Sequence, residues 1–139
     1  MPPPHRPPIV RVLLVDDSEA YTTALALVLN GNPRFAVVGR ALDGEDGIGL
    51  AEELGPDVVV VDVNMPRLDG FATAREIRER LPQTRIVIVT GEPRPEHARA
   101  ARLAGADVYL PKDVDYRTLS DVLSGEAQGD ELQSLAFAS

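Results

Sequence analysis

The sequence of 139 residues contains no cysteine, which excludes disulfide bonds and cysteine-based metal sites. Basic residues are also scarce, because 14 Lys and Arg stand against 22 Asp and Glu and leave a net charge of −8. A domain with this charge has no general attraction to nucleic acid or anionic lipid, so we do not expect the chain alone to bind DNA. The absence of cysteine is compatible with a reducing compartment, and a cytoplasmic location is expected.

Long apolar runs are missing as well. None approaches the roughly 20 residues that a membrane-spanning helix needs, and the N-terminus lacks the apolar stretch of a signal peptide. Residues 1–8 instead contain five prolines and are expected to form a disordered arm. Residues 9–124 are expected to form one domain of ordinary size. Residues 125–139 are interpreted as a C-terminal tail or linker.

Short apolar segments alternate with helical patterns along residues 9–124, and the unbroken valine run from Val58 to Val61 is the clearest strand. The predicted strands are 9–15, 35–41, 57–62, 85–90 and 107–110, and the predicted helices are 19–30, 45–54, 69–81, 95–104 and 116–123. Apolar strands joined by helical crossovers predict an α/β fold with a mostly parallel five-stranded sheet and helices on both faces. Periodicity alone leaves the strand order open.

Polar side chains gather where the predicted strands end, and ligands of parallel α/β sheets bind beyond those carboxyl ends. Asp16 and Asp17 follow the first strand, Asp62 ends the third, Thr90 ends the fourth and Lys112 follows the fifth. Two unit charges about 4 Å apart repel by roughly 4 kcal/mol at an effective dielectric near 20, so three carboxylates there need a cation or a raised pKa. Mg²⁺ suits such oxygen ligands. Each residue alone also fits a helix cap, a strand end or the surface, and it is their convergence that favours a site.

These residues resemble the receiver domains of two-component response regulators. The resemblance covers about residues 9 to 124, and its motifs are Asp16-Asp17, Asp62 in Val-Asp-Val-Asn-Met-Pro, Asp69-Gly70, Thr90-Gly91 and Tyr109-Leu110-Pro111-Lys112. It implies a flavodoxin-like, doubly wound fold with strand order 2-1-3-4-5.

The resemblance also implies a role for each matched residue. Asp62 is implied as the phosphoacceptor, with Mg²⁺ (Mn²⁺ as a substitute) as the cofactor. The implied metal ligands are Asp16, Asp17, Asp62 and the backbone carbonyl of Asn64. The implied phosphate-binding and switch residues are Thr90, Gly91, Lys112 and Tyr109.

The implied function is that of a phosphoacceptor that switches conformation, with slow self-dephosphorylation rather than enzymatic turnover. Its phosphoryl donor would be a sensor histidine kinase, and its output domain or target protein is not identified by the sequence. Tyr-Leu before Lys-Asp occurs in receivers attached to helix-turn-helix output domains, which points to transcription regulation. Apolar faces on the last two helices also allow a homodimer.

Two alternatives share part of this residue set. One is a Mg²⁺-dependent phosphohydrolase with an Asp nucleophile, although the chain shows no obvious cap or substrate-binding insertion. The other is a binding module on the same fold that works without phosphorylation, against which the intact acidic, Thr and Lys set argues. One local departure from the family concerns Lys112, which is followed by Asp113 instead of proline. The cis peptide usual at that point is therefore not expected.

Overall fold

The computed structural model describes residues 8–126. The strands are β1 (Val10–Val15), β2 (Phe35–Ala41), β3 (Val58–Asp62), β4 (Arg85–Thr90) and β5 (Val108–Pro111). The helices are α1 (Glu19–Asn30), α2 (Gly44–Leu54), α3 (Gly70–Arg80), α4 (Pro95–Leu103) and α5 (Tyr116–Ser124). The predicted succession of elements is confirmed, and their ends agree to within one residue. Residues 1–7 of the expected arm and 127–139 of the expected tail lie outside the described residues.

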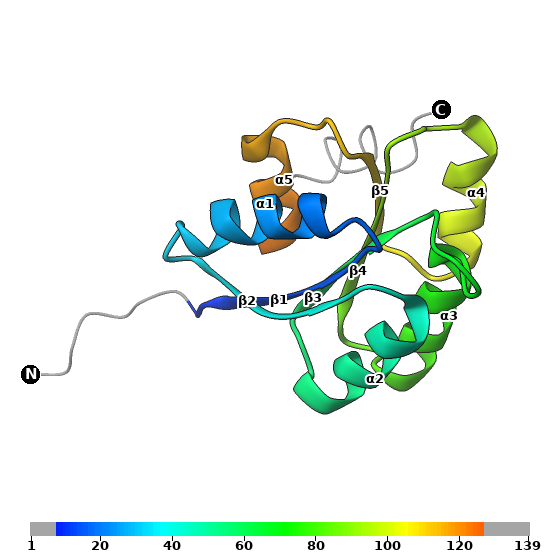
Figure 1. Ribbon diagram of the computed structural model, residues 1–139, viewed down its shortest axis with the longest axis horizontal. Coiled ribbons are helices and arrows are strands. Elements are labelled where there is room, and N and C mark those ends of the chain that lie inside the picture. The colour runs from blue at the N-terminus through cyan, green and yellow to red at the C-terminus, as the bar shows by residue number, and fades with distance from the viewer. Residues whose placement is uncertain (1–7, 127–139) are drawn as a thin grey trace, which may run out of the picture.

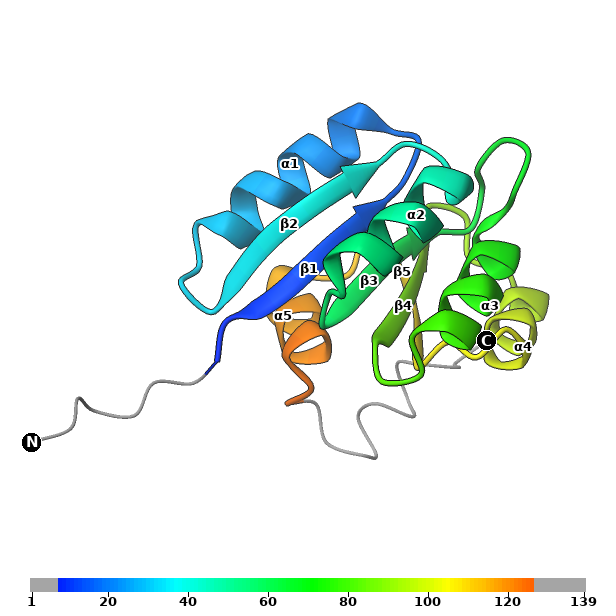
Figure 2. The ribbon, with the colours of Figure 1, turned by 90° about the horizontal axis from the view of Figure 1, so that it is seen from below.

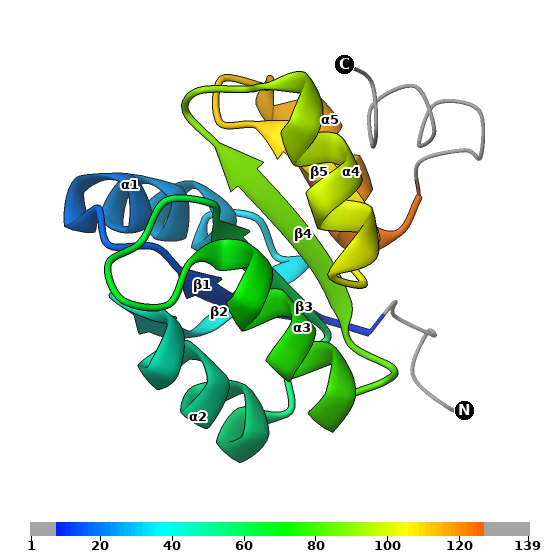
Figure 3. The same cartoon turned by 90° about the vertical axis from the view of Figure 1, so that its right-hand side faces the viewer.

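The five strands form one parallel sheet in the order β2-β1-β3-β4-β5, which confirms the order implied by the family resemblance. Helices α1 and α5 cover one face, and α2, α3 and α4 cover the other (Figures 1 and 2). Figure 3 looks onto the second face, with α2, α3 and α4 in front of the strands. From β1 the chain adds β2 on one side and then β3, β4 and β5 on the other. Folds of this kind bind ligands at the point between β1 and β3 where the direction of strand addition changes.

The valine run of β3 is explained by its central place in the sheet. Val58 and Val60 pack into the core beneath α1 and α5, whereas Val59 and Val61 pack into the core beneath α2, α3 and α4. Every residue of the strand is buried. Because both faces of β3 are covered, an alternating polar pattern is excluded there, and Asp62 is the first position at which a charge can reach the sheet edge.

At the amino-terminal edge of the sheet, the side chain of Arg78 from α3 ties two connections together. Its guanidinium group donates hydrogen bonds to the carbonyl oxygens of Pro82, Thr84 and Gly105, at 2.9, 2.7 and 3.0 Å. It also pairs with Asp107 at 2.7 Å. The partly exposed side chain of Arg78 therefore joins the α3–β4 connection to the α4–β5 connection, at the end of the sheet opposite the predicted site.

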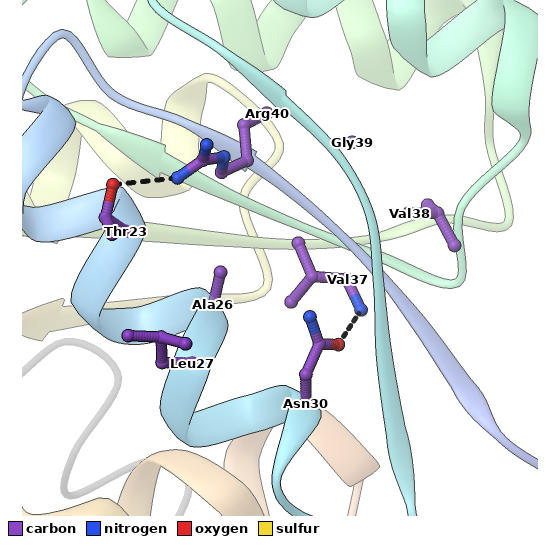
Figure 4. Close-up of a pocket in the computed structure, with 8 residues that line it drawn as sticks. All are labelled: Thr23, Ala26, Leu27, Asn30, Val37, Val38, Gly39 and Arg40. Carbon is purple, nitrogen blue, oxygen red and sulfur yellow. Dashed lines mark hydrogen bonds between the residues drawn. The ribbon is translucent and has the colours of Figure 1, made fainter.

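A hollow of about 400 Å³ lies between α1 and the edge strand β2 (Figure 4). Two hydrogen bonds cross it, from Arg40 to the Thr23 hydroxyl at 2.9 Å and from the Val37 amide to the Asn30 side chain at 2.8 Å. None of the predicted site residues lines this hollow, so it is separate from the site described below. Across residues 8–126, no helix has the length and apolar character that crossing a membrane requires.

Candidate functional site

Three carboxylates meet at the carboxyl edge of the sheet, as predicted. Asp16 and Asp17 follow β1, Asp62 ends β3, and one oxygen from each lies within 4.8 Å of the other two. Asp16 and Asp62 are buried, with only 2% and 5% of their surfaces exposed, whereas Asp17 is exposed. The cluster therefore has two charges held inside the protein and one at its open side.

The backbone next to each buried acid is tightly arranged. The Ser18 amide donates to Asp16 Oδ1 at 2.9 Å, and Ser18 in turn caps α1 by accepting from the Tyr21 amide. Next to Asp62, α3 begins at Gly70, where an added Cβ would lie only 2.1 Å from the Asp62 carbonyl oxygen. Gly70 is therefore required for α3 to start this close to the strand end, which gives the Asp69-Gly70 motif its physical reason.

Lys112 brings the compensating positive charge. Its Nζ lies 2.7 Å from Asp16 Oδ2 and 3.3 Å from Asp62 Oδ1. The lysine is positioned by its own backbone, because the Lys112 amide donates to the Thr90 carbonyl at 2.8 Å just beyond β5. The predicted convergence of Asp16, Asp17, Asp62 and Lys112 is thus present in the structure.

The electrostatics of the cluster are only partly balanced. Burial, and then the neighbouring charge of Asp16, raise the pKa of Asp62 to about 6, although Lys112 opposes this shift. Burial lowers the pKa of Lys112, but hydrogen bonding and attraction to Asp16 and Asp62 outweigh it and raise that pKa above its usual value. One lysine therefore does not neutralise the pocket, and the carboxylates keep a demand for further positive charge.

The residues present fit a hard divalent cation. Asp16 Oδ2 is buried, and within residues 8–126 its polar contact is the ion pair with Lys112 at 2.7 Å, which leaves further acceptor capacity on this oxygen. A buried carboxylate oxygen with unused acceptor capacity, beside two further carboxylates, is the donor set that Mg²⁺ prefers. Asn64, two residues after Asp62, lies exposed in the following loop.

The predicted switch residues lie on the adjoining strands. Thr90 is fully buried at the end of β4, and its hydroxyl accepts from the Glu92 amide at 3.1 Å. Gly91 is exposed next to it, with open space where a Cβ would stand. Tyr109 on β5 is buried with 4% of its surface exposed.

The Tyr109 hydroxyl faces α4. It lies 3.4 Å from Nδ1 of His97 and accepts from the Arg94 amide at 3.4 Å. The ring is also edge-on to the His97 imidazole. Tyr109 therefore links the end of β5 to the segment that leads from β4 into α4. Every peptide bond in the described part of the chain is trans, including the one between Lys112 and Asp113.

One residue of the site was not predicted from the sequence. The Tyr21 ring, in the first turn of α1, lies 4.4 Å from Lys112 Nζ. Burial, and then the charges of Asp16 and Asp62, raise the pKa of Tyr21 to about 12. Its spacing from the acidic pair could have indicated this place. Tyr21 comes four residues after Asp17, in the first turn of the helix that follows the pair, and so lies near the same strand ends.

Comparison with known proteins decides the family. The family model for the response regulator receiver domain matches residues 12–124. The chain belongs to this family. The receiver domain is 37% identical over 126 residues to the nitrate/nitrite response regulator protein NarL of Escherichia coli, covering 91% of this chain and 58% of NarL. It is 46% identical over 93 residues to protein-glutamate methylesterase/protein-glutamine glutaminase 2 of Methanospirillum hungatei, covering 67% of this chain and 26% of that protein.

The fold agrees with solved structures of the family. The signal receiver domain of the response regulator NarL from Mycobacterium tuberculosis superimposes with a TM-score of 0.77 and 30% identity, covering 86% of this chain and 99% of that chain. The chain is thus the receiver domain of a two-component response regulator. The family match favours this function over a phosphohydrolase or a phosphorylation-independent binding module. The receiver domain spans only part of its curated relatives, about a quarter of the methylesterase and 58% of NarL.

Proposed function

We propose that this receiver domain accepts a phosphoryl group on Asp62 from a sensor histidine kinase. The observation that supports the proposal most directly is the position of the Asp62 carboxylate. It ends the central strand, is buried, and lies beside Asp16, Asp17 and the Lys112 ammonium group. A carboxylate so placed is a suitable nucleophile for forming an aspartyl phosphate.

The transfer needs charge neutralisation and alignment more than covalent assistance. An oxygen of the ionised Asp62 carboxylate attacks the phosphorus of a phosphohistidine, the new O–P bond forms, and the N–P bond breaks with its electrons returning to the imidazole. Lys112, 3.3 Å from Asp62 Oδ1, is within reach of an oxygen on the incoming phosphoryl group. Mg²⁺, or Mn²⁺ in its place, supplies charge neutralisation when held by Asp16, Asp17, Asp62 and the Asn64 carbonyl.

The same chemistry suggests how the domain switches. A phosphoryl oxygen on Asp62 is a new acceptor for the Thr90 hydroxyl, and Gly91 leaves the backbone beside it unobstructed. In this proposal the movement of Thr90 at the end of β4 is passed to Tyr109 on the neighbouring strand β5, whose hydroxyl now faces Arg94 and His97. Shifting a two-state equilibrium from 1:99 to 99:1 takes about 5.5 kcal/mol, which several new charge-assisted contacts can supply.

The assignment of Asp62 is tested by mass spectrometry after incubation with acetyl phosphate and Mg²⁺. The wild-type domain gains the mass of one phosphoryl group, and the gain is lost in Asp62→Asn. Asp113→Asn is the matched control, because it removes one negative charge from an exposed position close to Lys112 in sequence. Absence of an acid-stable, base-labile adduct in the wild-type domain would reject Asp62 as the acceptor.

We further propose a regulatory rather than an enzymatic role. Slow loss of the phosphoryl group over minutes or longer, without rapid turnover of small phosphate esters, is expected and distinguishes the domain from a phosphohydrolase. The relatives named as nitrate/nitrite response regulator NarL and transcriptional regulatory protein YxjL support a role in transcription regulation. In this proposal an attached or separate output partner binds DNA. The receiver domain itself, with a net charge of −8, has no general attraction to nucleic acid.

The surrounding reading frame in the genome tests this last part. A helix-turn-helix segment encoded after residue 139 would support an output domain in the same chain, and a stop codon there would direct the search to a separate target protein. The cytoplasmic location and a homodimer through the last two helices both stay predictions. Size-exclusion chromatography with and without phosphodonor tests the second.

A further inference from the structure

Tyr21 is connected to the proposed phosphorylation site by its contact with the Lys112 ammonium group. It stands in the first turn of α1, where its amide donates to the Ser18 hydroxyl at 3.2 Å. Its half-buried ring lies 4.4 Å from Nζ of Lys112, well inside the distance at which an ammonium group is attracted to an aromatic face. Lys112 therefore has this contact in addition to its ion pairs with Asp16 and Asp62.

The ring completes the surroundings of the ammonium group. Lys112 carries its charge on a flexible four-carbon stem and can place it in many positions. In the structure, Asp16 at 2.7 Å and Asp62 at 3.3 Å attract the charge, and the Tyr21 ring adds a third contact. A tyrosine phenol has an ordinary pKa of about 10, so the ring is neutral at physiological pH and adds no further negative charge to the acidic pocket.

We propose that Tyr21 is a positioning residue for Lys112, holding its ammonium group beside Asp62 for phosphoryl transfer. This inference rests on the proposed function of Asp62 as phosphoacceptor. Transfer rates depend strongly on where the neutralising charge sits. A partly desolvated cation–π contact corresponds to roughly a 2- to 30-fold preference for the held position over the released ones. Loss of the ring reduces the ratio of held to released Lys112 by that factor, and the fraction of molecules with Lys112 in place falls by at most the same factor.

A purely structural reading of Tyr21 makes a different prediction. If the ring only covers the edge of the core, any large apolar side chain replaces it without effect on Lys112. Tyr21→Leu and Tyr21→Phe separate the two readings, because phenylalanine keeps the aromatic face and leucine does not. Tyr116→Leu is the matched control, since Tyr116 also stands in the first turn of a helix, is 38% exposed, and contacts Asn32 instead of Lys112.

The first measurement needs neither metal nor phosphodonor. In the NMR spectrum, the Lys112 ε-methylene protons are shifted upfield by the ring current in the wild-type domain, in Tyr21→Phe and in Tyr116→Leu. The shift disappears in Tyr21→Leu. A Lys112 signal that is unshifted in the wild type, or that keeps its shift in Tyr21→Leu, overturns the inference.

The second measurement is the rate of phosphorylation by acetyl phosphate at saturating Mg²⁺, with folding of each variant checked by circular dichroism. Tyr21→Leu is expected to react more slowly, by at most about 30-fold, while Tyr21→Phe and Tyr116→Leu stay within about 1.5-fold of the wild type. An unchanged rate in Tyr21→Leu, or an equal loss in Tyr21→Phe or in Tyr116→Leu, refutes a positioning role of the ring. If the wild-type domain is not phosphorylated at all, the proposed function fails, and the Lys112 shift alone decides whether the contact exists.

Discussion

Replacing Asp62 by asparagine is expected to stabilise the domain at neutral pH. The pKa of this carboxyl group is 3.8 in an unstructured chain and about 6 in the folded domain, a difference of about two units. At 1.36 kcal/mol per unit, ionised Asp62 costs the folded state at most about 3 kcal/mol. The cause is burial next to Asp16, and asparagine keeps the shape of the side chain while removing the charge.

The sign of the pH dependence follows from proton linkage. Because the folded state binds the Asp62 proton more tightly than the unfolded state, the contribution of Asp62 to the stability of the wild-type domain falls as pH rises from about 4 through about 6. Asp62→Asn does not titrate and escapes this loss. The free energy of unfolding of the variant should therefore equal that of the wild type near pH 4 and exceed it by roughly 1–3 kcal/mol at pH 7.5.

Urea denaturation followed by circular dichroism, at half-unit steps between pH 4 and 8 in EDTA, measures this difference. Asp113→Asn changes the net charge equally from an exposed position and should stay within about 0.5 kcal/mol of the wild type throughout. If Asp62→Asn were less stable than the wild type at pH 7.5, or if its advantage did not shrink toward pH 4, the electrostatic account of the pocket would be wrong.

Three further outcomes are expected. Gly70→Ala should lower the free energy of unfolding by about 1–3 kcal/mol and slow phosphorylation, because the new Cβ meets the Asp62 carbonyl, whereas Gly49→Ala, on an open helix face, should be neutral or stabilising by up to about 1 kcal/mol; urea melts in which both variants behave alike would contradict this. Millimolar Mg²⁺ should raise the Tm of the wild-type domain and raise that of Asp16→Asn much less, and equal gains in a thermal-shift assay would argue against a shared metal pocket. Thr90→Val should still form the Asp62 adduct but lose the phosphorylation-dependent change in the Tyr109 NMR signals, and a full change in those signals would remove Thr90 from the switch.

The fold was predictable from the sequence because its strands are short, apolar and bounded by charges. The valines before Asp62 and the acids after Val15 mark buried strands and the edge where they end. Strand order was a different matter. Hydrophobic periodicity reports burial but not neighbours, so the order came from the family resemblance and was then confirmed by the pairing of β1 with both β2 and β3.

The candidate site was predictable where residue types are chemically distinctive. Three carboxylates and a lysine at strand ends have few purely structural explanations, and the structure brings them together. Tyr21 escaped prediction because an aromatic residue in an amphipathic helix reads as a packing residue, and its contact with Lys112 joins positions 91 residues apart. The geometry that makes Tyr21 relevant exists only after β1 and β5 have been placed on either side of the sheet centre.

The contacts of Arg78 at the amino-terminal edge of the sheet have a mechanical consequence. The single guanidinium group of Arg78 fixes two connecting loops, and its four contacts all lie at the amino-terminal edge of the open sheet, opposite Asp62. Phosphorylation at the carboxyl edge is therefore expected to leave these four contacts intact and the amino-terminal edge in place. Movement is expected instead in the connection between β4 and α4, whose Glu92 and Arg94 amides donate to the Thr90 and Tyr109 hydroxyls.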